Sequence, residues 1–294
     1  MTEQTCYRHP DRVTGLSCSE CGRPICTECM TMAPVGIRCP EHSGRPQRVQ
    51  RVSRGVQRAA FEGVGAKVTR ALIALNIAVY VAELATGGGV NGTRGSIYEH
   101  GVLIARAIDS HGHLVGVAYG QYWRLLTAAF LHYGPFHLLM NMLALYWFGS
   151  LLEQRIGSAK FVLLYLVSGL AGSAGALIAS PLQPTVGASG AIFGVLGAGF
   201  VLERQRDYVF GGSALGIIVI NLVLTFSIPN ISIGGHIGGL IGGAAAALGL
   251  TRFGRAHAAY GRPGAVGVVT MLLVGLVSVA VAYAKAKGYH IAGT

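Results

Sequence analysis

Beyond residue 67 the chain alternates between long apolar blocks and shorter polar segments. The apolar blocks fall at 68–86, 135–153, 160–180, 188–203, 212–228, 234–251 and 265–284. Continuous apolar runs of about 20 residues are typical of membrane-spanning helices, although several of these blocks are shorter. The pattern therefore predicts an all-α polytopic membrane protein embedded in a lipid bilayer.

Composition supports this class. Hydrophobic residues make up 52% of the 294 residues and charged residues only 12%, whereas soluble domains carry about 25% charged residues. The mean hydropathy is +0.52. The net charge of +11 could indicate nucleic-acid binding, but the positive residues gather between Arg45 and Arg70 and in loops on one side of the blocks. That is the distribution of a membrane protein, so we expect no nucleic-acid partner.

The loop charges also predict an orientation. Lys and Arg recur in alternate loops, at Arg155, Lys160, Arg204, Arg206, Arg252, Arg255 and Arg262. The loops at 181–187 and 229–233 carry no charge. The positive-inside rule then places the N-terminus in the cytoplasm and, after seven spans, the C-terminus outside a plasma membrane. Residues 1–40 contain no apolar run, so no signal peptide is expected.

Reactive side chains collect at one predicted depth. With this orientation, His137, Ser189 and His236 open the second, fourth and sixth spans at the outer face, and Asn141 lies one turn below His137. A serine needs a base to become a nucleophile, and these spans offer no carboxylate at this level, so a Ser-His dyad is the economical interpretation. His137, Asn141 and the backbone N–H of Ser189 could donate to an oxyanion.

Each of these residues also has a plain structural explanation. Ser189 between Gly187 and Gly190 could be a small packing residue at a helix contact. His132 is more simply a structural histidine with satisfied hydrogen bonds. Only the combination of residues favours a catalytic site.

Residues 6–42 contain eight metal-ligand side chains in four pairs, each with two residues between its members. These are Cys6, His9, Cys18, Cys21, Cys26, Cys29, Cys39 and His42. Such spacing is typical of tetrahedral zinc sites, and about 40 residues have too little core to fold without metal. We expect two structural Zn²⁺ ions; the spacing permits either cross-braced or sequential pairing.

The membrane region resembles the rhomboid family of intramembrane serine proteases over about residues 68–251. The matching motifs are Trp123-Arg124, His137-x-x-x-Asn141, Glu153-Gln-Arg-Ile-Gly157, Gly187-x-Ser189-Gly190 and His236-Ile-Gly-Gly239. The resemblance implies a six-helix core, here followed by one C-terminal transmembrane helix. It also implies substrates that are single-span membrane proteins, cut in or near the transmembrane segment.

The resemblance also assigns roles. Ser189 would be the nucleophile and His236 the general base, with His137 and Asn141 lining the oxyanion site and no cofactor for catalysis. Phe193 stands where many relatives have tyrosine; its ring should still pack against His236.

The N-terminal module resembles a B-box-type zinc finger, which implies cross-bracing. One zinc would then be held by Cys6, His9, Cys26 and Cys29, and the other by Cys18, Cys21, Cys39 and His42. Such a module could recruit a cytoplasmic protein partner or serve only to stabilise the tail.

These observations predict a zinc-binding domain at 1–43, a basic linker at 44–67, a rhomboid core at 68–251 and a final segment at 252–294. The linker could be an amphipathic helix on anionic lipid or a disordered tether. The alternative to a protease is a catalytically inactive rhomboid-like protein that binds membrane helices. A transporter would show inverted repeats, which the sequence lacks.

Overall fold

The computed structural model describes residues 4–33, 36–43, 65–90, 93–109, 111–250 and 265–288. The chain forms two compact units, Met1–Glu62 and Gly63–Thr294. Most of the basic linker lies outside the described residues, as do Arg252, Arg255 and Arg262.

The N-terminal unit has a very small core. Its two strands, β1 (Thr31–Met32) and β2 (Ile37–Arg38), pair antiparallel. Five of its six buried hydrophobic side chains are cysteines, and the sixth is Ile25. A core built of thiols contributes little apolar burial, so the stability of this unit depends on what the thiols bind.

The second unit is mostly helical. Its principal helices are α2 (Lys67–Glu83), α5 (Pro135–Ala144), α6 (Ser150–Ile156), α7 (Ser158–Ala179), α8 (Ser189–Arg204), α9 (Ala214–Ser227), α10 (Ile233–Leu248) and α12 (Ala265–Gly288). A π-helical turn, Leu145–Gly149, joins α5 to α6, and another, Leu84–Gly88, ends α2. Each of the seven predicted apolar blocks contains a helix.

Four of these helices are long and apolar enough to cross a membrane: Lys67–Gly88, Pro135–Ile156, Ser158–Ala179 and Ala265–Gly288. Helices α9 and α10 are shorter apolar helices. The predicted class, a mostly helical polytopic membrane protein, is confirmed.

The segment between α2 and α5 is a folded loop of short elements. They are α3 (Ser96–Gly101), β3 (Ala107–Ile108), β4 (Leu114–Val115), the 3₁₀ turn Val117–Tyr119, α4 (Arg124–Thr127) and the 3₁₀ turn Ala128–Phe130. Strands β3 and β4 form an antiparallel hairpin. We call residues 89–134 the first loop.

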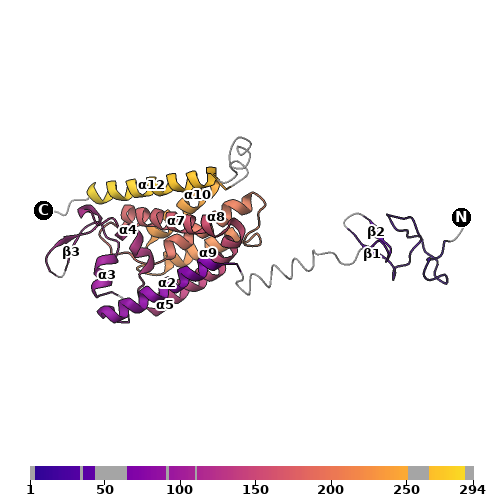
Figure 1. The fold of residues 1–294 in the computed structure, drawn as a ribbon, viewed down its shortest axis with the longest axis horizontal. Helices are drawn as coiled ribbons and strands as arrows, with labels where there is room; N and C mark the ends of the chain where they lie inside the picture. The colour runs from indigo at the N-terminus through magenta and orange to yellow at the C-terminus, as the bar shows by residue number, and fades with distance from the viewer. Residues whose placement is uncertain are drawn as a thin grey trace. The chain divides into compact units, whose positions relative to one another are not determined.

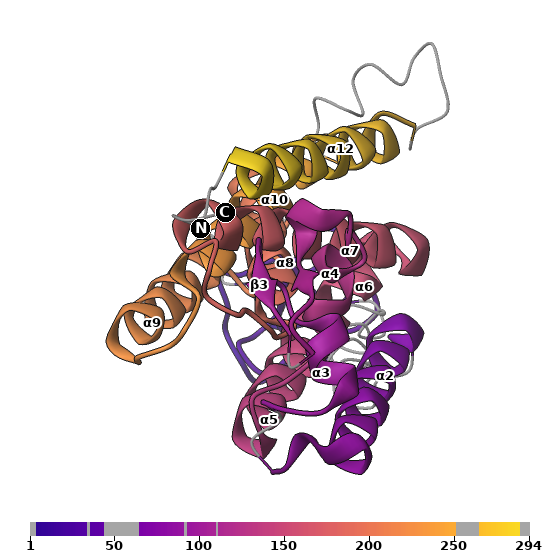
Figure 2. The same ribbon diagram turned by 90° about the vertical axis from the view of Figure 1, so that its left-hand side faces the viewer.

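Helix α7 lies at the centre of the bundle, between α8, α10 and α12. Figures 1 and 2 show α12 along one edge, beside α7 and α10. Figure 2 shows α9 projecting from the bundle. Because α9 contacts mainly α8, most of its surface is left for lipid.

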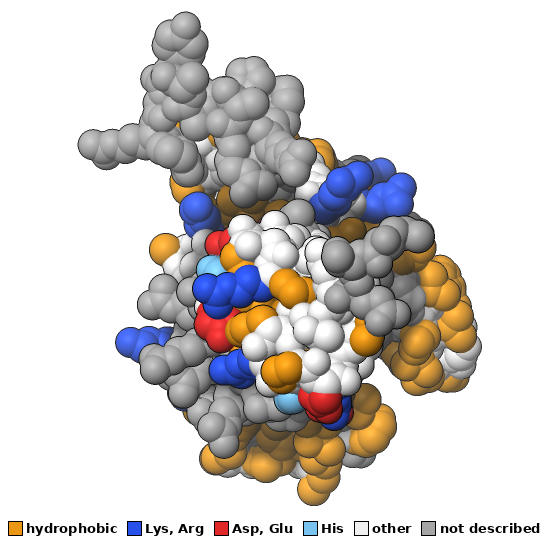
Figure 3. Space-filling model, turned by 90° about the vertical axis from the view of Figure 1, so that its right-hand side faces the viewer, with side chains coloured by type: hydrophobic (Ala, Val, Ile, Leu, Met, Phe, Trp, Pro, Cys, Tyr) orange, Lys and Arg blue, Asp and Glu red, His pale blue; other side chains and the backbone are white. Residues whose placement is uncertain are grey.

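The free surface of α9 is strongly apolar. Its exposed side chains include Leu215, Val219, Ile220, Val223 and Phe226. Figure 3 shows hydrophobic side chains gathered at the right-hand and lower edges of the view. In water such a surface would promote aggregation, whereas in a bilayer it is the expected lipid contact.

Helices α8 and α10 touch through their backbones. A Cβ atom added to Gly239 would lie 1.9 Å from the carbonyl oxygen of Gly190, and one added to Gly243 would lie 2.1 Å from the carbonyl oxygen of Gly194. The contact repeats one turn further along both helices. Small residues permit this close approach, which is a usual way to pack membrane helices.

Two carboxylates cap helix N-termini from neighbouring helices. Glu153 in α6 accepts hydrogen bonds from the N–H groups of Val68 (3.0 Å) and Thr69 (2.7 Å), which begin α2. Glu203 in α8 accepts one from the N–H of Ala214, which begins α9, at 3.0 Å. The first N–H groups of a helix lack internal partners, and the positive end of the helix dipole favours a carboxylate there. Both glutamates are thus explained by folding.

The glycine contact generates a first prediction. Gly239→Ala should lower the free energy of unfolding by about 1–3 kcal/mol, because the added methyl group overpacks a backbone contact. Gly216 in α9 is the matched control, since a Cβ there meets nothing within 4 Å. Gly216→Ala should leave stability unchanged or raise it slightly. Thermal unfolding of both variants in detergent measures the difference, and equal midpoints would contradict the packing argument.

Candidate active site

Ser189 and His236 are joined by a short hydrogen bond. Ser189 is the first residue of α8 and His236 the fourth of α10. The Ser189 Oγ lies 2.7 Å from the His236 Nε2. An imidazole nitrogen at this distance can take the hydroxyl proton and leave a nucleophilic oxygen.

Two further side chains fix the His236 ring. Phe193, one turn after Ser189, stacks on it with ring centroids 4.1 Å apart and an interplanar angle of 18°, which confirms the expected contact. On the opposite edge of the ring, Thr225 Oγ1 lies 2.7 Å from Nδ1. Both ring nitrogens of His236 therefore have a hydroxyl partner.

His137 borders the same space as Ser189. A Cβ added to Gly187 would lie 2.9 Å from the His137 Nε2 and 3.7 Å from the Ser189 Oγ. Only a glycine leaves this space open, and its φ of +123° also favours glycine. The His137 Nδ1 accepts the N–H of Tyr133 at 3.2 Å, so the neutral ring carries its proton on Nε2, as a donor. The Asn141 amide donates to the carbonyl of His137 at 2.8 Å, along its own helix.

The first loop holds the segment that leads into Ser189. Leu103 and Thr185 exchange backbone hydrogen bonds of 3.1 and 2.9 Å, and the N–H of Gly187 donates to the carbonyl of Ala128 at 2.8 Å. Two parts of the first loop, at Leu103 and at Ala128, therefore hold the segment that precedes Ser189.

Trp123 and Arg124 stabilise that loop. Arg124 is 1% exposed; its Nη1 donates to the carbonyl of Val102 at 2.8 Å and its Nε to the Gln121 side chain at 2.7 Å. The Trp123 indole N–H donates to the carbonyl of His100 at 2.9 Å. The buried guanidinium therefore cross-links loop backbone.

His132 is fully buried beside His137. Its ring lies 5.1 Å from that of His137, and its backbone N–H donates to Glu83 at 3.3 Å. Packing beside His137 and a backbone hydrogen bond to Glu83 hold this residue in place.

Sequence reasoning missed Thr225 and Tyr133. Both reach a histidine of the site through contacts that no motif spacing encodes. The one signal for Thr225 was its polar side chain in the mostly apolar helix α9, because polar residues within membrane segments are commonly functional.

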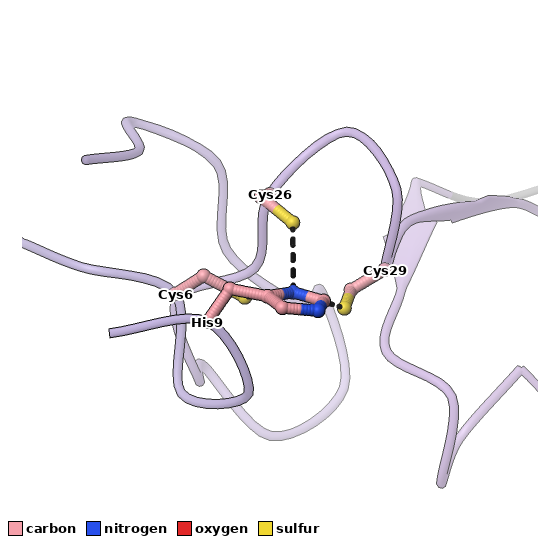
Figure 4. Close-up of side chains that lie close together, drawn as sticks. All are labelled: Cys6, His9, Cys26 and Cys29. Atoms are coloured by element: carbon pink, nitrogen blue, oxygen red, sulfur yellow. Dashed lines mark hydrogen bonds between the residues drawn. The ribbon is translucent and has the colours of Figure 1, made fainter. Parts of the chain in front are cut away.

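The cysteines and histidines of the N-terminal unit form two groups. Within each group, the ligand atoms all lie within 4.8 Å of one another. They are Cys6, His9, Cys26 and Cys29, and Cys18, Cys21, Cys39 and His42. This is the cross-braced arrangement. Figure 4 shows the first group converging on the His9 ring.

The spacing of the ligand atoms suits a tetrahedral zinc ion, which requires about 3.8 Å between two sulfurs and about 3.6 Å between sulfur and nitrogen. The His9 Nδ1 lies 3.4 Å from the sulfurs of Cys26 and Cys29 and 3.9 Å from that of Cys6. In the second group, the sulfurs of Cys21 and Cys39 are 3.8 Å apart. None of the six cysteines forms a disulfide. The donors present therefore fit two metal ions.

Comparison with known proteins identifies the family. Residues 119–253 match the profile of the Rhomboid domain. The chain is 37% identical over 153 residues to YdcA of Bacillus subtilis, named provisionally as a rhomboid protease, and covers 76% of that protein. This chain belongs to the rhomboid family. The segment of this rhomboid that matches the profile includes Ser189, His236 and His137.

Other relatives share less of their length with this rhomboid. It is 39% identical over 211 residues to Rhomboid protease GluP of Bacillus subtilis, a match that covers 70% of this chain but 39% of GluP. It is 40% identical over 129 residues to RHOMBOID-like protein 1 of Arabidopsis thaliana, which covers 42% of this chain and 33% of that protein.

Proposed function

We propose that this rhomboid is an intramembrane serine endopeptidase that uses Ser189 as nucleophile and His236 as general base. The observation that carries the proposal is the 2.7 Å hydrogen bond between Ser189 Oγ and His236 Nε2. Membership of a family in which relatives are named as proteases supports it.

In the proposed reaction, Ser189 Oγ attacks the carbonyl carbon of the scissile peptide while His236 Nε2 takes the hydroxyl proton. The same nitrogen then gives this proton to the leaving amine, which frees one product and leaves an acyl ester on Ser189. A water molecule, deprotonated by His236, hydrolyses the ester and restores the serine.

The oxyanion would form in the space next to Gly187. The His137 Nε2–H faces this space, and the backbone N–H of Ser189 lies at the positive end of α8. We propose that these two donors stabilise the oxyanion and that Asn141 lines the same site with His137. Asn141 would support His137 through its bond to the carbonyl of that residue.

We propose single-span membrane proteins as substrates, cut in or near their transmembrane segment. The serine lies among helices with lipid-facing apolar surfaces, where a second membrane helix can approach from the bilayer. A relative without activity that binds membrane helices is the alternative.

We further propose a plasma-membrane location with the N-terminus inside. An ion pair of 2.5 Å joins Arg155, in the last turn of α6, to Asp207 after α8, at the end of the bundle where Glu153 also caps α2. Arg106 of the first loop donates to the carbonyl of Lys287, near the end of α12, at 3.2 Å. These contacts support a common side for the basic loops and the opposite side for the first loop and the C-terminal end of α12.

The second prediction tests the dyad. Purified protein should react with a fluorescent fluorophosphonate. Ser189→Ala should abolish labelling because it removes the nucleophilic hydroxyl oxygen. His236→Ala should slow labelling by about 10²–10⁴-fold, through loss of the general base. Gel fluorescence against time measures both rates.

Ser278→Ala is the matched control, because among the described residues the Ser278 hydroxyl bonds only the carbonyl of Val274 in its own helix, at 2.7 Å. It should label like wild type. Wild-type protein that melts cooperatively yet is not labelled, in detergent and in lipid, would contradict the protease and favour the helix-binding alternative.

For the N-terminal unit we propose two structural Zn²⁺ ions within a domain of residues 1–43. When bound, zinc would fasten the loops to one another and supply the stability that the small core lacks. The structure adds no support for a cytoplasmic protein partner, so we propose only this structural role.

The third prediction concerns metal content. Elemental analysis of protein purified without chelator should find two zinc ions per chain. Cys26→Ser and Cys39→Ser each remove a ligand from a different group, so each should lower the content to about one. Ser17→Ala, which alters no ligand, should keep both. A cysteine variant that retained two ions would contradict the assignment of that ligand.

A further inference from the structure

The hydroxyl of Thr225 lies between a histidine nitrogen and a carbonyl oxygen. Its Oγ1 is 2.7 Å from the His236 Nδ1 and 2.7 Å from the carbonyl oxygen of Asn221, one turn earlier in α9. The side chain is 2% exposed. Threonine commonly bonds the carbonyl four residues before it in a helix.

Counting protons decides the direction of these bonds. A hydroxyl has one proton, and the carbonyl of Asn221 can only accept, so both contacts are hydrogen bonds only when the proton of Thr225 goes to that carbonyl. The Thr225 oxygen is then left as an acceptor for a proton on His236 Nδ1. A neutral imidazole with its proton on Nδ1 has a lone pair on Nε2, the nitrogen that faces Ser189.

We propose that Thr225 is a positioning residue that holds His236 in the tautomer able to accept the Ser189 proton. The inference rests on the proposed function and assigns to a neutral hydroxyl the task that an aspartate performs in a Ser-His-Asp triad. Thr225 itself takes part in no bond-making step.

The opposite tautomer would disable the pair. With its proton on Nε2, His236 would donate to Ser189 Oγ and could not take the hydroxyl proton. The Phe193 ring stacked on His236 restricts tilting but does not distinguish the two nitrogens. Among the contacts of the ring, only Thr225 selects one tautomer.

When the ring becomes an imidazolium, the Nδ1–H bond to Thr225 continues through the hydroxyl to the carbonyl of Asn221. Linked hydrogen bonds polarise one another, so the chain disperses part of the new charge. A neutral oxygen does this less well than a carboxylate. The main contribution of Thr225 is therefore selection of the tautomer and orientation of the ring.

The fourth prediction uses two substitutions of Thr225. Thr225→Val keeps the shape but removes the hydroxyl, and should slow fluorophosphonate labelling by about tenfold, equivalent to ~1.4 kcal/mol. Thr225→Ser restores a hydroxyl and should recover most of the rate. Thr270 makes the same bond to a carbonyl in its own helix, to Val266 at 2.8 Å, so Thr270→Val controls for loss of such a bond and should label like wild type.

The tautomer of His236 can be measured without an activity assay. In ¹⁵N-histidine-labelled protein, the His236 signals are identified by their loss in His236→Ala. The Nδ1 signal should then be that of a protonated nitrogen in both wild type and Thr225→Ser. Thr225→Val should shift His236 toward the other tautomer. An unchanged tautomer, or wild-type labelling by Thr225→Val, would overturn the inference. If wild-type protein is not labelled at all, the proposed function fails, while the nitrogen spectra still decide the role of Thr225.

Discussion

The site depends on the backbone contact between α8 and α10. Ser189 directly precedes Gly190, and His236 lies three residues before Gly239, whose added Cβ would stand 1.9 Å from the Gly190 carbonyl oxygen. The glycines that bring the two helices together therefore also set the 2.7 Å between serine and histidine. Because the contact continues one turn later, the two helices form one rigid piece, and the pair is positioned by packing instead of by a flexible loop.

A second constraint explains three of the charged residues near the ends of helices. Backbone groups in or near lipid must find partners within the protein. Glu153 and Glu203 supply them to the helix starts at Thr69 and Ala214, and Arg124 supplies them to the first loop. These ionisable side chains complete the fold around the site. A charged residue near a membrane site is therefore weak evidence of catalysis until its hydrogen bonds are counted.

The sequence could predict the elements but not all of the contacts between them. Apolar blocks located the helices, and loop charges brought His137, Ser189 and His236 to one depth. Ligand spacing alone left the metal pairing open, because four equal pairs can be joined in more than one way. The contact of Thr225 with His236 crosses a turn and depends on the angle between α9 and α10, which no periodicity encodes.

The membrane also gives a physical reason for a hydroxyl in place of a carboxylate beside His236. A buried carboxylate loses its hydration, at an effective cost of several kcal/mol, and repays it only with several well-placed donors. Around the imidazole, the Nδ1–H would be the single donor. A threonine that already gives its proton to the carbonyl of Asn221 enters the same position without a charge to desolvate, and still presents an acceptor to Nδ1. In a helix surrounded by lipid, a neutral acceptor thus keeps the orientation of the base at much lower cost, with weaker stabilisation of the imidazolium as the consequence.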